Sequence, residues 1–255
     1  DHGLLDLQLS AQRVVQSESE CRVQGVIQDG EPGEAFRCEL VFAPAYPLAP
    51  EALPVDAVKP IQHNPPHALY ERGMFHGPRL QGVVGLQGWG DTSIAGTLQA
   101  LPLADLVESS TDASGWQTDP VVLDAVGQLA GYWLSEKYNA GFNCFPYAVE
   151  SIRFFAPPQA TGDLCPANGT FREQGADSFA VDWQVLDARG QLLVDIKNWC
   201  DRRFTVTPAF TQWRSHPQTS LLTAAIDIPG MPAAIRVLPH QPESFWEQGG
   251  AVWLR

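Results

Sequence analysis

The sequence predicts an α+β fold with a mostly antiparallel sheet and one long helix. Short segments with apolar residues at every second position recur along the chain, and turn residues separate them. A single long segment has the broad apolar face of a buried helix. Of the 255 residues, 44% are hydrophobic and 18% are charged, which is a globular composition. The length suits one large domain or two of moderate size.

The predicted strands precede and follow this helix. In the first of them, Leu5, Leu7 and Leu9 fall on one face. The turn Ala188-Arg189-Gly190 is expected to join the last two as a hairpin, and Asn168-Gly169-Thr170, although it fits the glycosylation pattern, is predicted to be a simple turn. The predicted strands are 4–14, 19–29, 35–43, 82–89, 93–101, 143–155, 178–187 and 191–206.

The helix is predicted over residues 121–138. Thr118-Asp119-Pro120 supplies a capping residue and a proline at an early helical position, both typical of a helix start. The residues expected on its buried face are Val122, Ala125, Val126, Leu129 and Trp133. Proline-rich residues 44–67 cannot form a central strand or a long helix, so they predict a linker between two halves.

Charge and cysteine content restrict the function classes. The net charge of −13 argues against a nucleic-acid or anionic-membrane partner, because both require an excess of Lys and Arg. The five widely spaced cysteines are predicted to be free, mostly packed thiols. No basic n-region marks a signal peptide, and no apolar run reaches about 20 residues, so we expect a cytoplasmic protein.

The sequence predicts neither a metal site nor a nucleotide cofactor. His63 and His67 are four residues apart, but Pro65-Pro66 between them prevents a shared helical face. The chain contains no G-x-G-x-x-G segment and no P-loop. We therefore expect chemistry that depends on side chains alone.

Asp124 and Gln128 are the candidate catalytic residues of the helix. Four residues apart, they share one face with Val121 and Ala125. Desolvation raises the pKa of a carboxyl group in an apolar interior, which makes such a group a candidate proton donor near neutral pH. Gln128 could orient the carboxyl through an amide hydrogen bond. The competing interpretation is a solvated aspartate on the outer face of the helix.

Residues 69–82, LYERGMFHGPRLQG, contain a histidine beside a Gly-Pro pair that is expected to break secondary structure. Gly77-Pro78 should interrupt a helix or strand, and Gly82 permits close approach of the backbone to a neighbour. His76 is expected to form a hydrogen bond near the aspartate or a substrate. The alternative is a purely structural histidine.

Three motifs in order resemble the dehydratase domains of polyketide synthases. DPVVLDAVGQLAGYW is similar to the family's helix motif, in which Asp124 corresponds to the catalytic aspartate and Gln128 follows one turn later. FHGPRLQG resembles the YGPxFQG element, with His76 at the Tyr position and Leu80 at the Phe position. FNCFPYAVESIRFF is similar to a strand that lines the acyl tunnel. The FHGP form and KNWCDRRF look closest to iterative enediyne and polyunsaturated-fatty-acid synthases.

The resemblance implies a double hotdog, two copies of a curved antiparallel sheet around a central helix, with the first copy incomplete here. The expected organisation is C-terminal strands of the first hotdog in 1–58, a linker in 59–66, the second hotdog with the catalytic helix in 67–208, and a C-terminal tail or interdomain segment in 209–255. It also implies a substrate channel lined by Phe75, His76, Gly77, Pro78, Gln81, Phe145 and Pro146.

The implied reaction is the elimination of water from a 3-hydroxyacyl thioester carried on the phosphopantetheine arm of an acyl carrier protein. Asp124 would protonate the leaving C3 hydroxyl, and a histidine would remove the C2 proton. The resemblance further implies a homodimer and neighbouring synthase domains. The family's histidine lies in an H-x-x-x-G-x-x-x-x-P motif, which is absent here. We expect that a segment before Asp1 carries it and that the chain belongs to a longer synthase.

Three alternatives to a dehydratase remain open from the sequence. A product-template cyclase uses the same double-hotdog pair of residues, and a non-catalytic dehydratase-like domain would serve as a scaffold for dimerisation or carrier-protein docking. A carbohydrate-binding β-domain would use exposed tryptophans. However, Trp133, Trp183 and Trp199 fall in patterns with apolar neighbours and are predicted to be core residues.

Overall fold

The computed structural model describes residues 7–28, 35–56, 59–62, 69–70, 74, 76–103, 106, 116–138 and 144–203. The chain divides into two compact units, residues 1–48 and 49–255.

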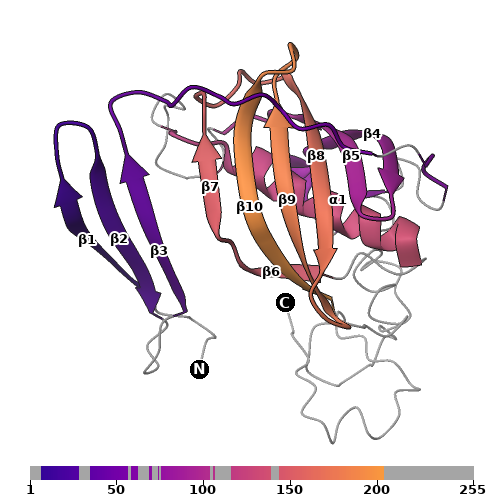
Figure 1. Cartoon of the computed structure of the whole chain (residues 1–255), viewed down its shortest axis with the longest axis horizontal. Coiled ribbons are helices and arrows are strands. Elements are labelled where there is room, and N and C mark those ends of the chain that lie inside the picture. Colours follow the sequence, from indigo (N-terminus) through magenta and orange to yellow (C-terminus); the bar gives the residue numbers. More distant parts are fainter. Residues whose placement is uncertain are drawn as a thin grey trace, which may run out of the picture. The chain divides into compact units, whose positions relative to one another are not determined.

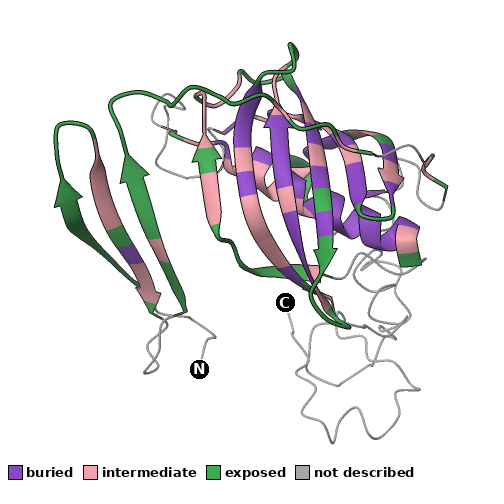
Figure 2. Cartoon of the chain, in the orientation of Figure 1, coloured by how far each residue is buried: buried purple, intermediate pink, exposed green. Residues whose placement is uncertain are grey.

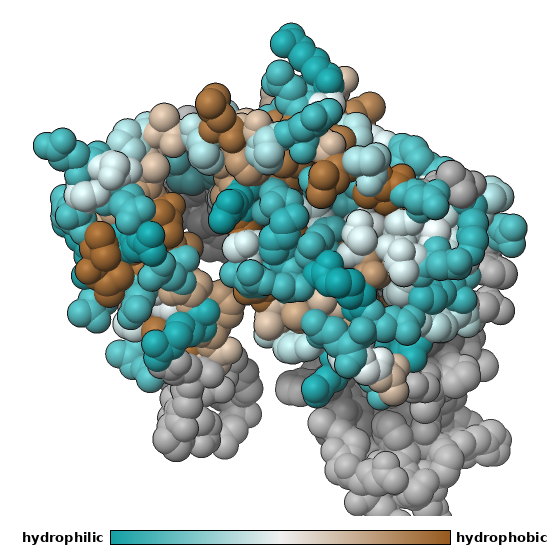
Figure 3. Space-filling model, in the orientation of Figure 1, coloured by the Kyte–Doolittle hydropathy of each residue, from teal (hydrophilic) through white to brown (hydrophobic). Residues whose placement is uncertain are grey.

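The unit of residues 1–48 is a three-stranded antiparallel sheet in the order β1-β2-β3. Its strands are β1 (Gln8–Gln16), β2 (Cys21–Gln28) and β3 (Phe36–Phe42), which confirms the three strands predicted there. Nearly all of its described side chains are exposed or half-buried, as the green and pink ribbons of Figure 2 show. Hydrophobic side chains accordingly reach its surface (Figure 3); they include Leu9, Val15, Phe36, Leu40 and Val41.

The unit of residues 49–255 contains a seven-stranded antiparallel sheet in the order β4-β5-β8-β9-β10-β6, with β7 also paired to β10. The single strand predicted over 143–155 is wrong, because the chain forms two strands that pair with successive parts of β10. The strands are β4 (Val83–Gly90), β5 (Ser93–Gln99), β6 (Cys144–Ala148), β7 (Ser151–Phe154), β8 (Leu164–Glu173), β9 (Ser178–Leu186) and β10 (Leu192–Arg203).

The helix α1 (Pro120–Tyr138) lies along one face of this sheet, which curves around it (Figure 1). This is the arrangement of one hotdog that the family resemblance implied. The start of α1 also follows the prediction: Asp119 Oδ1 accepts hydrogen bonds from the backbone N–H groups of Val121 (2.9 Å) and Val122 (3.0 Å), and Pro120 is the first helical residue. The cap fixes where the helix begins and therefore the rotation of every later side chain.

The core lies between α1 and the sheet. All five residues predicted for the buried helix face are at most 5% exposed. The ring of Trp133 stacks on Phe171 with centroids 3.9 Å apart, and Phe171 meets Trp183 edge to face at 5.7 Å. Trp133 Nε1 donates to Gly90 O (3.1 Å), which satisfies its buried polar atom. Trp133 and Trp183 are thus core residues, and neither is available for stacking on a sugar.

Asn168-Gly169-Thr170 was predicted to be a turn, and this prediction is wrong. The three residues lie within β8 and pair with both β5 and β9. Gly169 has no side chain because a Cβ there would collide with the ring of Trp183 on β9. The glycine that suggested a turn in the sequence therefore accommodates a tryptophan ring across the sheet.

The five cysteines are free thiols, as predicted. Only Cys165 is buried; the other four are half-buried, so the expectation of mostly packed thiols is only partly met. In the part of the chain that the structure describes, no helix is both long and apolar enough to span a membrane.

Candidate active site

Asp124 and Gln128 lie one turn apart on α1 and are in direct contact. Gln128 Nε2 donates a hydrogen bond of 2.7 Å to Asp124 Oδ2. The residue Gln128 is 2% exposed, whereas the side chain of Asp124 is 40% exposed. The carboxyl group is therefore held from the protein side by a buried amide while part of it remains accessible to a substrate. The predicted contact between the two residues is confirmed.

A short segment before β4 completes the surroundings of Gln128. The 3₁₀ turn η2 (Pro78–Leu80) brings the carbonyl oxygen of Leu80 to 2.7 Å from Gln128 Nε2. Tyr70, from the start of the same stretch, donates its hydroxyl proton to Gln128 Oε1 at 2.6 Å. Each polar atom of the Gln128 amide thus has a partner in residues 69–82, and none of these partners was predicted.

His76 also reaches the carboxyl group. Its Nε2 atom lies 3.4 Å from Asp124 Oδ2, and its side chain is 12% exposed. Gln81 Nε2 donates to the backbone oxygen of His76 (2.9 Å), which ties the two ends of η2 together. The expectation that His76 lies beside the aspartate is confirmed, and its place in the structure is that of a group paired with the acid.

Gly82 and Gly77 differ in what they contribute. A Cβ at Gly82 would lie 2.9 Å from the Cβ of Ala125 on α1, so only glycine allows this approach of chain and helix. At Gly77 a Cβ would meet nothing within 4 Å, and its φ of −71° and ψ of 170° suit any residue. Gly77 therefore has room for a side chain, whereas Gly82 is the position of close packing, as the sequence analysis expected.

The remaining predicted channel residues fall in different parts of the chain. Phe75 lies outside the described residues. Phe145 and Pro146 are exposed on β6, whose partner strand is β10, and Phe145 is 52% exposed. Pro78 begins η2 and Gln81 follows it, so these two belong to the segment that contacts Gln128. Only part of the predicted channel set is therefore brought together with the acid.

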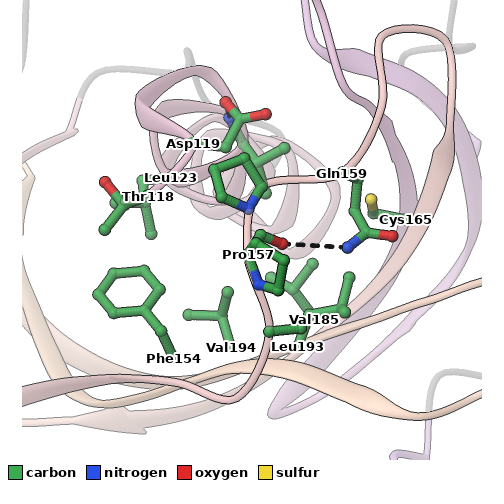
Figure 4. Close-up of a pocket in the computed structure, with 13 residues that line it drawn as sticks. Thr118, Asp119, Leu123, Phe154, Pro157, Gln159, Cys165, Val185, Leu193 and Val194 are labelled. Atoms are coloured by element: carbon green, nitrogen blue, oxygen red, sulfur yellow. Dashed lines mark hydrogen bonds between the residues drawn. The ribbon is translucent and has the colours of Figure 1, made fainter. Parts of the chain in front are cut away.

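A pocket lies beside the first turn of α1 (Figure 4). Most of its lining side chains are apolar, among them Leu123, Phe154 and Val194, and Asp119 contributes a carboxyl group. Burial raises the pKa of Asp119, and the two backbone hydrogen bonds of the helix cap partly oppose this. Asp124 and Gln128 do not line this pocket, so the tunnel expected beside Asp124 stays a prediction.

Tyr70 is the residue of this cluster that the sequence analysis missed. Its hydroxyl accepts the backbone N–H of Val83 (2.8 Å) and donates to Gln128, so it joins β4 to α1. Burial is the main reason why the pKa of Tyr70 is well above its usual range, and the hydroxyl is therefore neutral. An aromatic residue with a polar tip, six positions before His76, was the available signal.

The fold and this cluster define a class: a hotdog domain with a hydrogen-bonded carboxyl group on its central helix. The family model of the polyketide synthase dehydratase N-terminal domain matches residues 50–209. The chain therefore belongs to the polyketide synthase dehydratase family, and it is a dehydratase domain of a type I polyketide synthase.

Solved structures of this family share the fold. The dehydratase domain from the CurK module of the curacin polyketide synthase is 15% identical with a TM-score of 0.53, covering 78% of this chain and 69% of that one. The dehydratase domain of RzxB from Pseudomonas fluorescens is 14% identical with a TM-score of 0.52, covering 76% of this chain and 68% of that one. The dehydratase domain of PpsC from Mycobacterium tuberculosis is 20% identical with a TM-score of 0.51, covering 78% of this chain and 68% of that one. A comparison with curated proteins gives no match.

These matches bear on the predicted double hotdog and leave the domain limits open. The family model is named for the N-terminal domain, whereas the motifs predict a second hotdog in residues 67–208. The compact units separate after Leu48. The limits predicted at 58, 66 and 208 stay predictions.

Proposed function

We propose that Asp124 is the general acid in the elimination of water from a 3-hydroxyacyl thioester. The observation that supports this is the pairing of its partly accessible carboxyl with the buried amide of Gln128. Removal of the C2 proton by a base forms the C2=C3 double bond and breaks the C3–O bond. The proton of Asp124 passes to the departing hydroxyl, which leaves as water. The C2 proton stays on the base, so atoms and charge balance.

The base in this proposal is a histidine that the family resemblance implies and that these 255 residues do not present in the expected motif. His76 is a poor candidate for it, because its Nε2 faces the acid at 3.4 Å. A base and an acid of one elimination act on different atoms of the substrate, C2 and the C3 oxygen. His76 instead holds the same carboxyl oxygen as Gln128.

The partners follow from the family. We propose that the thioester is presented on the phosphopantetheine arm of an acyl carrier protein, that the domain functions as a homodimer beside other synthase domains, and that it works in the cytoplasm without a metal or nucleotide cofactor. The acidic net charge of −13 is compatible with this use, because no step requires a polyanionic partner.

The direct test mixes the intact domain with 3-hydroxyacyl carrier proteins of several chain lengths and follows the acyl mass. Loss of one water that is abolished by Asp124→Asn supports the proposal. Asp177→Asn is the matched control, because this aspartate lies in the connection between β8 and β9 and is 74% exposed at its side chain. An unchanged acyl mass with every substrate would contradict the proposal and favour a scaffold role.

A cyclase activity is the second candidate. A bifunctional dehydratase-cyclase domain from ambruticin biosynthesis is 20% identical to this chain, with a TM-score of 0.50, and covers 78% of this chain and 68% of that one. Absorbance recorded alongside the acyl mass separates the two activities when the substrate carries a second, internal hydroxyl. Dehydration alone gives an enoyl thioester with its characteristic absorbance, whereas a following ring closure removes that absorbance without a further change in mass.

A further inference from the structure

The hydroxyl of Tyr70 has one proton and two neighbours. The backbone N–H of Val83 can only donate, so at 2.8 Å the Tyr70 oxygen must accept from it. The single phenolic proton is then directed to Gln128 at 2.6 Å. The atom of Gln128 that faces Tyr70 must therefore be its carbonyl oxygen, Oε1.

The opposite side of the Gln128 amide leads independently to the same assignment of its oxygen and nitrogen atoms. The atom 2.7 Å from the carbonyl oxygen of Leu80 must be the donor Nε2, because a carbonyl oxygen only accepts. The same Nε2 has its second proton directed to Asp124 Oδ2 at 2.7 Å. Oxygen and nitrogen of a glutamine amide are hard to tell apart by shape, but here the chemistry of two neighbours assigns them.

We propose that Tyr70 is a positioning residue that fixes the amide of Gln128 so that its N–H anchors Asp124 Oδ2 and leaves the acidic proton on Oδ1. This inference rests on the proposed role of Asp124 as the acid. A proton on Oδ2 would point at the Gln128 N–H, and His76 Nε2 approaches the same oxygen at 3.4 Å. The proton that leaves with the C3 hydroxyl is therefore the one on Oδ1.

Tyr70→Phe removes the proton that Tyr70 donates to Gln128 Oε1 and keeps the aromatic ring. The orientation of the amide then depends on the carbonyl oxygen of Leu80, and an amide that turns over presents Oε1 to Asp124. A protonated carboxyl would donate its proton to that oxygen instead of to the substrate. We expect kcat to fall about tenfold, the effect of one lost hydrogen bond, while KM stays nearly constant because no substrate contact is removed.

A double-mutant cycle separates this role from a structural one. Tyr70 also holds Val83 at the start of β4, so a loss of rate in Tyr70→Phe could reflect displacement of the strand. Gln128→Met removes the amide and nearly preserves its length. If Tyr70 acts through Gln128, adding Tyr70→Phe to Gln128→Met causes no further loss of kcat. An undiminished tenfold loss in the double variant would overturn the inference.

A second measurement does not depend on activity. In the intact domain labelled with ¹⁵N, the side-chain NH₂ group of Gln128 is assigned by its loss in Gln128→Met. We expect both of its protons to exchange slowly with water, and Tyr70→Phe to shift their signals and speed their exchange at least tenfold. Signals and exchange that are unchanged in Tyr70→Phe overturn the inference even if the proposed function holds. Absence of dehydration by the unmodified domain contradicts the proposed function, and the NMR result still decides the role of Tyr70.

Discussion

Two carboxyl groups of the unit 49–255 show how differently this fold can treat the same side chain. Asp124 is 40% exposed at its side chain, and Gln128 and His76 hold its Oδ2 atom. Asp201, on β10, is 1% exposed, and its Oδ2 atom has no hydrogen-bond partner among the described residues. Burial raises the pKa of Asp201 to about 7, and the nearby indole of Trp199 opposes this to a smaller extent. A supported acid can serve chemistry, whereas an unsupported buried one mainly affects stability.

The position of Asp201 results from a β-bulge. Ile196 pairs with Trp183 and Trp199 with Val181, so Lys197 and Asn198 together lie opposite one residue of β9. The extra residue returns Trp199 and Asp201 to the face that the helix covers. Asn198 adopts the left-handed conformation, with φ of 47°, and its backbone N–H donates to Asp182 at 2.9 Å.

Trp199 and Asp201 have different neighbours on the inner side of the sheet. The ring of Trp199 lies against Gly127 of α1, where a Cβ would come within 3.4 Å of it. Asp201 is paired across the sheet with Phe179, which is 3% exposed. The register of the strand thereby places an acid among apolar groups. Two predictions test how far the two carboxyl groups differ, and a third compares two glycines beside the site.

The largest expected effect is on the pH dependence of stability through Asp201. Its carboxyl keeps its proton in the folded state up to about pH 7 but loses it near 3.8 when unfolded. Between these values a rise in pH favours the unfolded state, so this group lowers the free energy of unfolding by about 3 kcal/mol from pH 4 to 7. Asp201→Asn should remove this loss. The measurement is urea unfolding of both proteins from pH 4 to 8.

The comparison of the two unfolding curves provides its own control. Other carboxyl groups, such as Asp182, whose pKa is lowered mainly by its hydrogen bond with Arg172 against the effect of burial, change stability in the opposite direction. They are common to both proteins and cancel in the difference. The variant should match the unmodified protein near pH 4 and exceed it at pH 8. Parallel curves over the whole range would show that Asp201 ionises alike in both states.

The second effect is on the rate of dehydration through Asp124. Asp124→Asn should lower kcat by about 100-fold, equivalent to about 2.7 kcal/mol in the barrier, because it removes the proton donor. Asp201→Asn should leave the rate within twofold at pH 7. Turnover of a 3-hydroxyacyl carrier protein, measured for both variants, provides the test. A loss of rate in Asp201→Asn as large as that in Asp124→Asn would end the distinction between the two groups.

The smallest effect concerns the two glycines of residues 69–82. Gly82→Ala should cost about 1–3 kcal/mol, because the added methyl group lies 2.9 Å from Ala125 Cβ and α1 must shift. Gly77→Ala, the matched control, should change stability by less than about 0.5 kcal/mol. Thermal unfolding of both variants measures the difference. Equal losses would mean that the bend at Gly77, and not the contact of Gly82, supports the site.

Local chemistry in the sequence was sufficient for the helix and for one contact of the site. The cap at Asp119 follows from its residue type before Pro120. The buried face of α1 and the Asp124–Gln128 pair follow from the 3.6-residue period, which places residues four apart on one face. Most strands followed in the same way from the two-residue period. These features depend on neighbours within a few positions of the chain.

Only the tertiary structure decided which distant groups meet. The partners of Gln128 come from Tyr70 and Leu80, 58 and 48 residues away along the chain. Gly169 was predicted to be a turn residue because the side chain that requires a glycine there, the ring of Trp183, lies on the neighbouring strand. The sequence analysis singled out no role for Asp201, and its place on the inner face depends on the bulge in β10. Periodicity carries no information about register shifts or about contacts between elements, because both depend on how the sheet closes around the helix.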